Sequence, residues 1–230
     1  MKLLYLHTGV LKNKDFFEKS MMLISKERRE KILKYQKEQT ARLSLGVGLL
    51  LEIAMDQEGI RNKEIQNEEY GKPYLPVENF HFNLSHSGEY AICVYDRLPV
   101  GVDLQIIKDT TPKHTKRILS ETELDYLLSL DEEERRTEFY NIWSVKESIV
   151  KWDGRGLRIP LTDLTVIDKG QKVKEIDFER KKVYLYFSDL LLPGYALSIC
   201  SEKQILMDRI HEIDTKFLTK YYNVFIFIEK

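Results

Sequence analysis

The chain is poor in residues that cross-link or interrupt a fold, and neither sign of charge is in excess. Its 230 residues include 2 cysteines and 6 prolines, and 36 basic side chains against 37 acidic ones leave a net charge of −1. Cys93 and Cys200 lie far apart in apolar stretches, so we expect buried thiols and neither a disulfide framework nor a zinc module. The near-zero charge argues against a DNA-coating protein, which is usually strongly basic.

Long apolar runs are missing as well. The run after Met1 is too short for a signal peptide, and the longest apolar stretch, residues 45–55, is interrupted by two glycines and by Glu52. Nothing approaches the roughly 20 apolar residues that a membrane span needs. With 43% hydrophobic and 32% charged residues, the composition predicts a cytoplasmic globular protein without a membrane partner.

Strands and helices follow one another in an order that indicates an α+β fold. Helical periodicity is clearest over residues 38–57, the Ser120 and Glu123 capping box opens another helix, and Asp131 can cap a third that runs to about residue 151. Strands are predicted at residues 3–7, 81–85, 90–96, 100–105, 164–167, 173–176, 183–187, 195–200 and 222–228.

The same order predicts two α/β halves. Residues 90–93 resemble residues 195–200, and each of these strands follows a glycine turn. Duplication and chance similarity between two buried strands explain this resemblance equally well. We place the halves at residues 1–105 and 106–230, with a tail from about residue 201 that matches neither half.

Three segments could carry chemistry. The first, residues 82–88, has Ser85 and His86 where an apolar strand meets a turn, so hydroxyl, imidazole and backbone N–H groups could meet an anion. Taken alone, the segment favours a polar hairpin turn with an incidental histidine.

The second segment places an acid in an apolar strand. Asp103 and Gln105 share one strand face because strand side chains alternate. An acid inside a strand is costly unless it is paired or bound to a metal. The alternative is an acid at a strand-end turn.

The third segment is helical. Trp143, Glu147 and Lys151 are spaced at i, i+4 and i+8, so they form one stripe on the helix. The alternative is an ordinary surface pair of Glu147 and Lys151.

Together, the segments indicate a site for a cation and a polyphosphate. An acid from a strand and an acid from a helix can hold Mg²⁺, with substrate phosphates completing its shell. Lys72, His86 and Lys151 could neutralise the phosphates. No Walker-type loop and no G-x-G-x-x-G pattern is present in the sequence.

These motifs, in this order, resemble the 4′-phosphopantetheinyl transferases of the long, two-half type that serves peptide and polyketide synthetases. The resemblance covers roughly residues 25–160. It is carried by Gly71-Lys72-Pro73, Phe82-Asn83-Leu84-Ser85-His86-Ser87, Gly101-Val102-Asp103, Trp143-Ser144-Val145-Lys146-Glu147-Ser148, Lys151 and Gly154-Arg155-Gly156-Leu157.

The resemblance implies that the chain moves phosphopantetheine from coenzyme A, its co-substrate, to a serine of an acyl or peptidyl carrier protein. Mg²⁺ would be the cofactor, and adenosine 3′,5′-bisphosphate would leave. The resemblance also implies two similar halves related by a pseudo-twofold axis, and a monomer, because one chain supplies both halves.

The resemblance further implies roles for individual residues. Asp103, Gln105 and Glu147 match the metal site, and Glu147 is the expected base, with His86 as the rival. Lys151 matches the lysine on the phosphates. The residues expected to bind the coenzyme are Arg28, Lys31, Arg42, Lys72, Ser85, His86 and Lys151.

One position departs from the family pattern. Many members carry an acid where this chain has Gln105, whose amide oxygen can ligate a cation but brings no charge. The alternatives are a coenzyme A or carrier-binding homologue without transferase activity, another Mg²⁺-dependent phosphotransferase, or an RNA-binding protein using the basic residues 26–37. We expect no nucleic-acid partner, since no aromatic platform accompanies the basic run.

Overall fold

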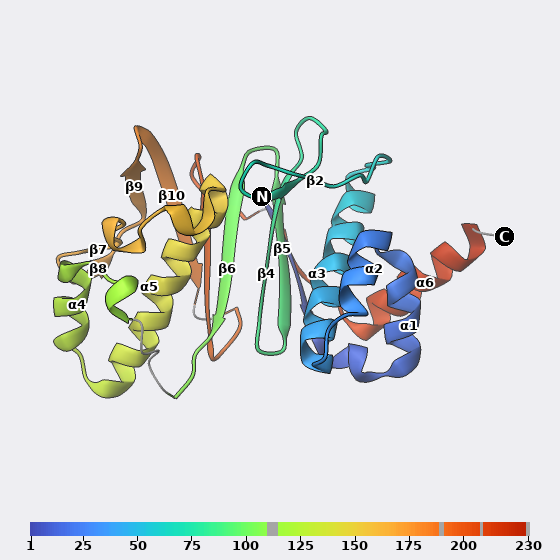
Figure 1. Ribbon diagram of the computed structural model, residues 1–230, viewed down its shortest axis with the longest axis horizontal. Helices are drawn as coiled ribbons and strands as arrows, with labels where there is room; N and C mark the ends of the chain where they lie inside the picture. The colour runs from blue at the N-terminus through green and yellow to red at the C-terminus, as the bar shows by residue number, and fades with distance from the viewer. Residues whose placement is uncertain (110–114, 189–190, 208, 229–230) are drawn as a thin grey trace. The chain divides into compact units, whose positions relative to one another are not determined.

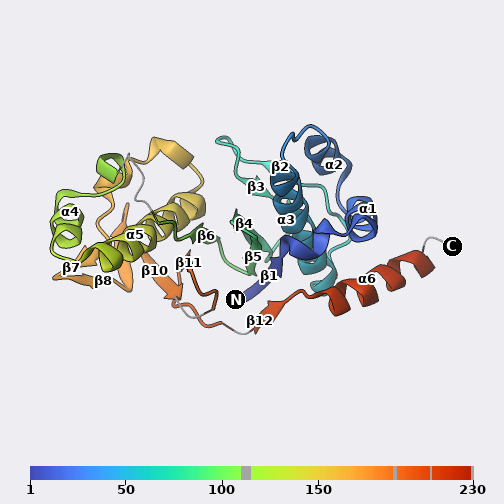
Figure 2. The ribbon, with the colours of Figure 1, turned by 90° about the horizontal axis from the view of Figure 1, so that it is seen from below.

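The computed structural model describes residues 1–109, 115–188, 191–207 and 209–228, and the side chains of these residues except 157 and 222–228. Helices and strands occur in both parts of the fold, which confirms the predicted α+β class (Figures 1 and 2). The chain forms two compact units. Unit 1 contains Met1 and residues 64–83 and 94–206, and unit 2 contains residues 2–63, 84–93 and 207–230.

The two units interleave along the sequence. Unit 1 takes up residues 64–83 from the first half of the chain, and unit 2 takes up the end of the chain from residue 207. The two units therefore group the residues differently from the predicted single division after Gln105. The division at that point into two similar halves stays a prediction.

Unit 2 contains the helices of the two ends of the chain. They are α1 (Lys14–Leu23), α2 (Lys26–Ile32), α3 (Glu38–Gln57) and α6 (Thr215–Ile228), with the short 3₁₀ helix η1 (Thr8–Lys12). Residues 2–7, 84–87, 90–93 and 209–212 of this unit belong to a four-stranded sheet with the order β12 (Arg209–Glu212), β1 (Lys2–His7), β5 (Tyr90–Asp96) and β4 (His81–Ser87). The helices α1 and α2 pack on α3, which in turn packs on β1.

Unit 1 is built on a second four-stranded sheet, with the order β6 (Val100–Ile106), β11 (Tyr195–Ser201), β10 (Lys181–Ser188) and β9 (Glu175–Phe178). The helices of this unit are α4 (Glu121–Leu128) and α5 (Glu132–Asp153), with 3₁₀ helices η2 (Thr115–Arg117), η3 (Gly156–Arg158) and η4 (Leu161–Asp163). Two small hairpins are formed by β2 (Gln66–Asn67) with β3 (Pro73–Tyr74) and by β7 (Ile167–Asp168) with β8 (Gln171–Lys172).

The sequence determines where α5 begins and ends. The Oδ1 of Asp131 accepts a hydrogen bond from the N–H of Glu134 at 2.9 Å, as predicted for a cap. Gly154 follows the last turn with φ 94°, a conformation that favours glycine. The Ser120 and Glu123 capping box that opens α4 is also present.

The helix α5 lies very close to strand β6 at Gly101. A Cβ on Gly101 would overlap the carbonyl oxygen of Ser148 and would lie 2.7 Å from the Cβ of Trp152. The helix then packs along β6 and β11. Its inner face, with Phe139, Ile142 and Ile149 fully buried, forms the core of unit 1.

Two predictions about strands were wrong. Residues 222–228 belong to α6, because Asp214 caps a helix there: its Oδ1 accepts from the N–H of Phe217 at 2.7 Å. The aromatic and β-branched residues of this segment had favoured a strand. The strand that joins the sheet edge is β12, which leads into α6 (Figure 2).

Residues 164–167 are also not a full strand, since only Ile167 enters β7. Leu164 and Val166 are buried in the core of unit 1. Their apolar character therefore reflects packing in the core.

Both thiols are fully buried and free, as expected. Burial raises the pKa of Cys200 to about 12 and that of Cys93 further. In the part of the chain that the structure describes, no helix is both long enough and apolar enough to cross a membrane.

The contact at Gly101 gives a stability prediction. We expect Gly101→Ala to lower the free energy of unfolding by about 1–3 kcal/mol or more, the range for overpacking a tight core. The atoms in the way are backbone atoms, so the helix itself must shift. Urea unfolding measures the change.

Gly9→Ala is the matched control. Its Cβ would meet only the end of the His7 side chain, at 2.6 Å, and that ring can turn away. We expect a change within about 0.5–1 kcal/mol. Equal losses in the two variants would show that the approach of α5 to β6 is not tight.

Candidate active site

Strand β6 and helix α5 bring four predicted site residues together in unit 1. Asp103 and Gln105 are on β6, and Glu147 and Lys151 are on α5. The Asp103 side chain is almost fully buried, with 3% of its surface exposed. Buried carboxylates need partners, and the structure supplies them.

The Asp103 carboxylate is held by two donors. The ammonium of Lys151 lies 2.6 Å from Oδ1, and the Nε2 of Gln105 donates to Oδ2 at 2.8 Å. The second contact confirms that Asp103 and Gln105 share a strand face. It also shows that Gln105 presents its amide nitrogen, and not its oxygen, to the acid.

Glu147 lies on the predicted stripe of α5. Its Oε1 accepts a hydrogen bond from the indole Nε1 of Trp143 at 3.4 Å, one helical turn away. Burial raises the pKa of Glu147, and the negative charge of Asp103 raises it further, whereas Lys151 and Trp143 oppose the shift. The two acids are therefore near enough to repel one another.

The backbone of β6 is fixed beside these side chains. The hydroxyl of Ser144 on α5 donates to the carbonyl oxygen of Asp103 at 3.1 Å. On the other side, the Oδ1 of Asn83 accepts from the N–H of Val102 at 3.0 Å. These contacts hold the strand at the position where Asp103 meets the helix.

The acid pair fits a hard divalent cation. Two carboxylates and an amide are oxygen donors of the kind that Mg²⁺ prefers, and their mutual repulsion is what a cation would relieve. Among the described residues, no group of three or more His, Cys, Asp or Glu side chains could hold a metal. A site here would therefore have Asp103 and Glu147 as its only charged protein ligands within the described part of the chain.

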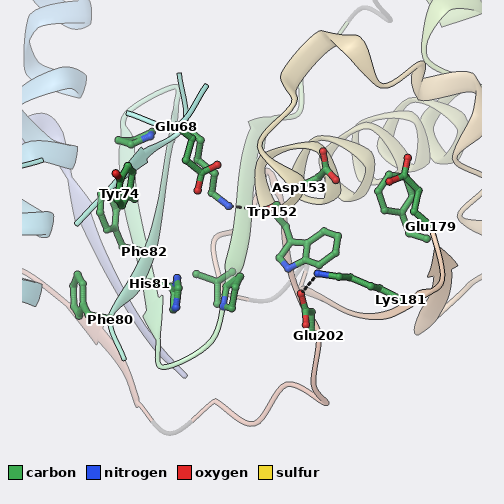
Figure 3. Close-up of a pocket in the computed structure, with 15 residues that line it drawn as sticks. Glu68, Tyr74, Phe80, His81, Phe82, Trp152, Asp153, Glu179, Lys181 and Glu202 are labelled. Atoms are coloured by element: carbon green, nitrogen blue, oxygen red, sulfur yellow. Dashed lines mark hydrogen bonds and ion pairs between the residues drawn. The ribbon is translucent and has the colours of Figure 1, made fainter. Parts of the chain in front are cut away.

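Lys72 lies elsewhere in unit 1, beside a pocket of about 370 Å³. Its ammonium donates to the carbonyl oxygen of Trp152 at 2.5 Å, and burial lowers the pKa of Lys72. Figure 3 shows Tyr74, Phe80, His81 and Phe82 along one wall, and Trp152, Asp153, Glu179, Lys181 and Glu202 along the other.

Trp152 supplies an unused donor at this pocket. The residue is 6% exposed, and its buried Nε1 has no hydrogen-bond partner in the structure. The neighbouring Lys181 lies over the indole ring, 5.5 Å from its centroid, and also pairs with Glu202 at 2.8 Å (Figure 3). The pocket thus offers aromatic surface, a cation and a free indole N–H.

The remaining predicted residues belong to unit 2. Arg28 is half-buried on α2 and its Nη1 donates to the carbonyl oxygen of Ser44 at 3.3 Å. Arg42 on α3 lies 3.6 Å from the exposed Glu38, and its buried Nε has no hydrogen-bond partner in the structure. Lys31 is exposed on α2.

Ser85 and His86 are also in unit 2, but not at a turn as predicted. Strand β4 continues through Ser87, and the turn is formed by Gly88 and Glu89. Consecutive strand residues point to opposite faces, and accordingly Ser85 is buried and His86 exposed. The two side chains therefore do not act as one turn cluster.

Sequence reasoning missed the pocket. Trp152 directly follows Lys151, so its position in the sequence could have indicated a second binding residue. Lys181 begins β10 and Glu202 follows β11, both far from Trp152 in sequence, so no local pattern pointed to them.

Comparisons with known proteins agree on one family. A family model described as the 4′-phosphopantetheinyl transferase superfamily matches residues 99–200. A second model, described as 4′-phosphopantetheinyl transferase, N-terminal, matches residues 12–97.

Individual relatives are similar over most of the chain. The 4′-phosphopantetheinyl transferase Sfp of Bacillus subtilis is 36% identical over 190 residues, which are 80% of this chain and 84% of that protein. The 4′-phosphopantetheinyl transferase gsp of Aneurinibacillus migulanus is 33% identical over 183 residues, 77% of this chain and 76% of that one.

The contact between Lys151 and Asp103 can be tested by a double-mutant cycle. We expect Lys151→Met to lower the free energy of unfolding by about 1–3 kcal/mol, because the buried Asp103 carboxylate loses its ammonium partner. In the Asp103→Asn background the same substitution should cost clearly less. Urea unfolding of the four proteins gives the coupling, and strictly additive losses would show that the two side chains do not interact.

Proposed function

The chain belongs to the 4′-phosphopantetheinyl transferase superfamily, and from this premise we propose how its own residues perform the transfer. The substrate is coenzyme A, and the acceptor is a carrier protein. In the reaction, a serine oxygen of the carrier forms a bond to phosphorus, the bond to the leaving adenosine 3′,5′-bisphosphate breaks, and the serine proton must be removed.

The observation that supports this assignment is the buried Asp103 beneath Glu147 and Lys151. Asp103 is paired with the Lys151 ammonium at 2.6 Å, and its charge raises the pKa of the nearby Glu147. Two acids and an ammonium placed in this way suit the binding of a cation and phosphates. Asp103 and Glu147 would hold Mg²⁺, with Gln105 able to turn its amide oxygen toward it. Bound there, the cation would offset negative charge on the pyrophosphate.

Glu147 is the proposed base. Its carboxylate lies beside Asp103 on the face of α5 that carries Lys151, where it could accept the serine proton. The hydrogen bond from Trp143 fixes its orientation. His86, which is exposed on β4, is assigned to binding a phosphate of the coenzyme, and Lys151 to offsetting charge on the transferred phosphate. Ser85 points to the other face of the strand, so its proposed contact with the coenzyme would be a separate one.

The coenzyme needs further contacts away from the reacting phosphorus. We assign its adenosine end to the pocket beside Lys72, where the aromatic walls suit a planar base and the free Nε1 of Trp152 can donate to a ring nitrogen. We assign its 3′-phosphate to Arg28, Lys31 and Arg42. The buried Nε of Arg42, without a partner in the structure, supports that choice.

The remaining expectations concern partners. We propose an acyl or peptidyl carrier domain of a peptide or polyketide synthetase as the acceptor, a single chain as the active form, a cytoplasmic location and no nucleic-acid partner. Gln105 alone favours the alternative of a homologue that binds without transferring.

The transfer itself can be tested directly. Apo carrier protein incubated with this protein, coenzyme A and Mg²⁺ should gain the mass of one phosphopantetheine group, as seen by intact-protein mass spectrometry. Chelation of the metal should abolish the gain. Glu147→Gln should slow it by roughly 100- to 10,000-fold, the usual contribution of a general base.

Glu133→Gln is the control, because Glu133 is exposed on the same helix. It should transfer at the wild-type rate. If peptide, polyketide and fatty-acid carriers all stay unmodified while coenzyme A still binds, the binding-only alternative replaces the transferase.

Gln105 gives a separate prediction about the metal. Gln105→Glu would replace the amide that now donates to Asp103 with a third carboxylate. A cation bound there would offset the repulsion among the three carboxylates, so the variant should bind Mg²⁺ more tightly. It should therefore reach half-maximal activity at a lower Mg²⁺ concentration. An unchanged Mg²⁺ titration would argue against Gln105 lying in the metal site.

A further inference from the structure

Lys146 is a charged side chain that the proposed mechanism does not use. It precedes Glu147 on α5, and both Lys146 and its partner Glu123 on α4 have 0% of their side-chain surface exposed. Burying two charges is costly, and an apolar pair of similar size often stabilises a fold as well or better. Stability alone is therefore a poor explanation for this pair.

The Lys146 ammonium is tied to three separate segments. It donates to the carboxylate of Glu123, to the carbonyl oxygen of Ile118 at 2.6 Å and to the carbonyl oxygen of Leu161 at 2.9 Å. An ammonium has three donors, so all three are used. The acceptors come from α4, from the residue after η2 and from η4.

Glu123 extends the same cluster. Its Oε2 accepts from the N–H of Ser120 at 2.8 Å, and its Oε1 accepts from the N–H of Val166 at 2.8 Å. Two carboxylate oxygens thus join the start of α4, the segment before β7 and the middle of α5. We call Glu123 and Lys146 with these backbone partners the buried latch.

The latch lies on a different side of α5 from the reacting groups. Neighbouring residues on an α-helix point about 100° apart, so Lys146 and Glu147 leave the helix in different directions. A rotation or a slide of α5 that moved Glu147 relative to Asp103 would pull Lys146 away from its acceptors. The latch therefore fixes the rotation of the helix at the position of the site.

We infer that Glu123 and Lys146 are positioning residues for the transfer: by fixing α5, the latch sets Glu147 and Lys151 against Asp103. This inference rests on the proposed roles of Glu147 and Lys151. Neither latch residue contacts the reacting atoms. The latch acts on the rate of the reaction through the geometry of α5.

The kinetic test uses Lys146→Met, which keeps the length of the side chain and removes its ammonium. We expect kcat to fall by roughly 10- to 100-fold, the size of a small misplacement of reacting groups, while KM for coenzyme A changes less than about threefold. The control is Lys172→Met, which breaks another ion pair on α5, between Lys172 and Glu138 at 3.2 Å. The control should keep its kcat within about twofold.

A second readout does not depend on activity. The chain has 2 tryptophans, so the indole N–H groups give two signals in a ¹⁵N–¹H correlation spectrum, and Trp143→Phe identifies one of them. The Trp143 N–H donates to Glu147, so its signal should move in Lys146→Met and stay in place in Lys172→Met. If the wild-type protein did not transfer, the proposed function would fail, but this signal would still test the latch.

One further variant covers the case in which Lys146→Met does not fold. Glu123→Gln combined with Lys146→Met leaves no unpaired charge inside, and the same losses are expected of it. Either folded variant with wild-type kcat and an unmoved Trp143 signal would overturn the inference and leave the latch a purely structural pair.

Discussion

The close approach of α5 to β6 is the constraint on which unit 1 depends. Gly101 has no side chain, and the backbone of α5 at Ser148 occupies the space that a Cβ would need. At this separation the Ser144 hydroxyl reaches the carbonyl oxygen of Asp103. The result is that Asp103 is buried under the helix and still lies within reach of Lys151.

The same contact explains the electrostatics of the candidate site. Asp103 is buried between a strand and a helix, and Lys151 and Gln105 on those two elements stabilise its carboxylate. Glu147 lies beside this arrangement, and its pKa is raised by burial and by the charge of Asp103, although Lys151 opposes the shift. Two carboxylates so close together repel one another, and a bound cation would remove this repulsion.

Local patterns predicted much of this arrangement. The strand face shared by Asp103 and Gln105 and the stripe from Trp143 to Glu147 follow from the periods of strands and helices, and the caps at Ser120 and Asp131 follow from local hydrogen bonding. The pocket beside Trp152 and the latch at Glu123 join residues that are distant in sequence, which periodicity cannot report. The strand prediction for residues 222–228 failed for a different reason: the segment continues a helix whose cap, Asp214, lies before it in the sequence, and this outweighed its strand propensity.

The pairing of β12 with β1 has a consequence for how the protein is made. The two strands are parallel, and residue 2 lies opposite residue 209. During synthesis β1 therefore leaves the ribosome long before β12 exists, and this edge of β1 stays unpaired until β12 has been translated. Pairing of segments so far apart in sequence is slow to form, so the sheet can be completed only after α1, α2 and α3 have been made.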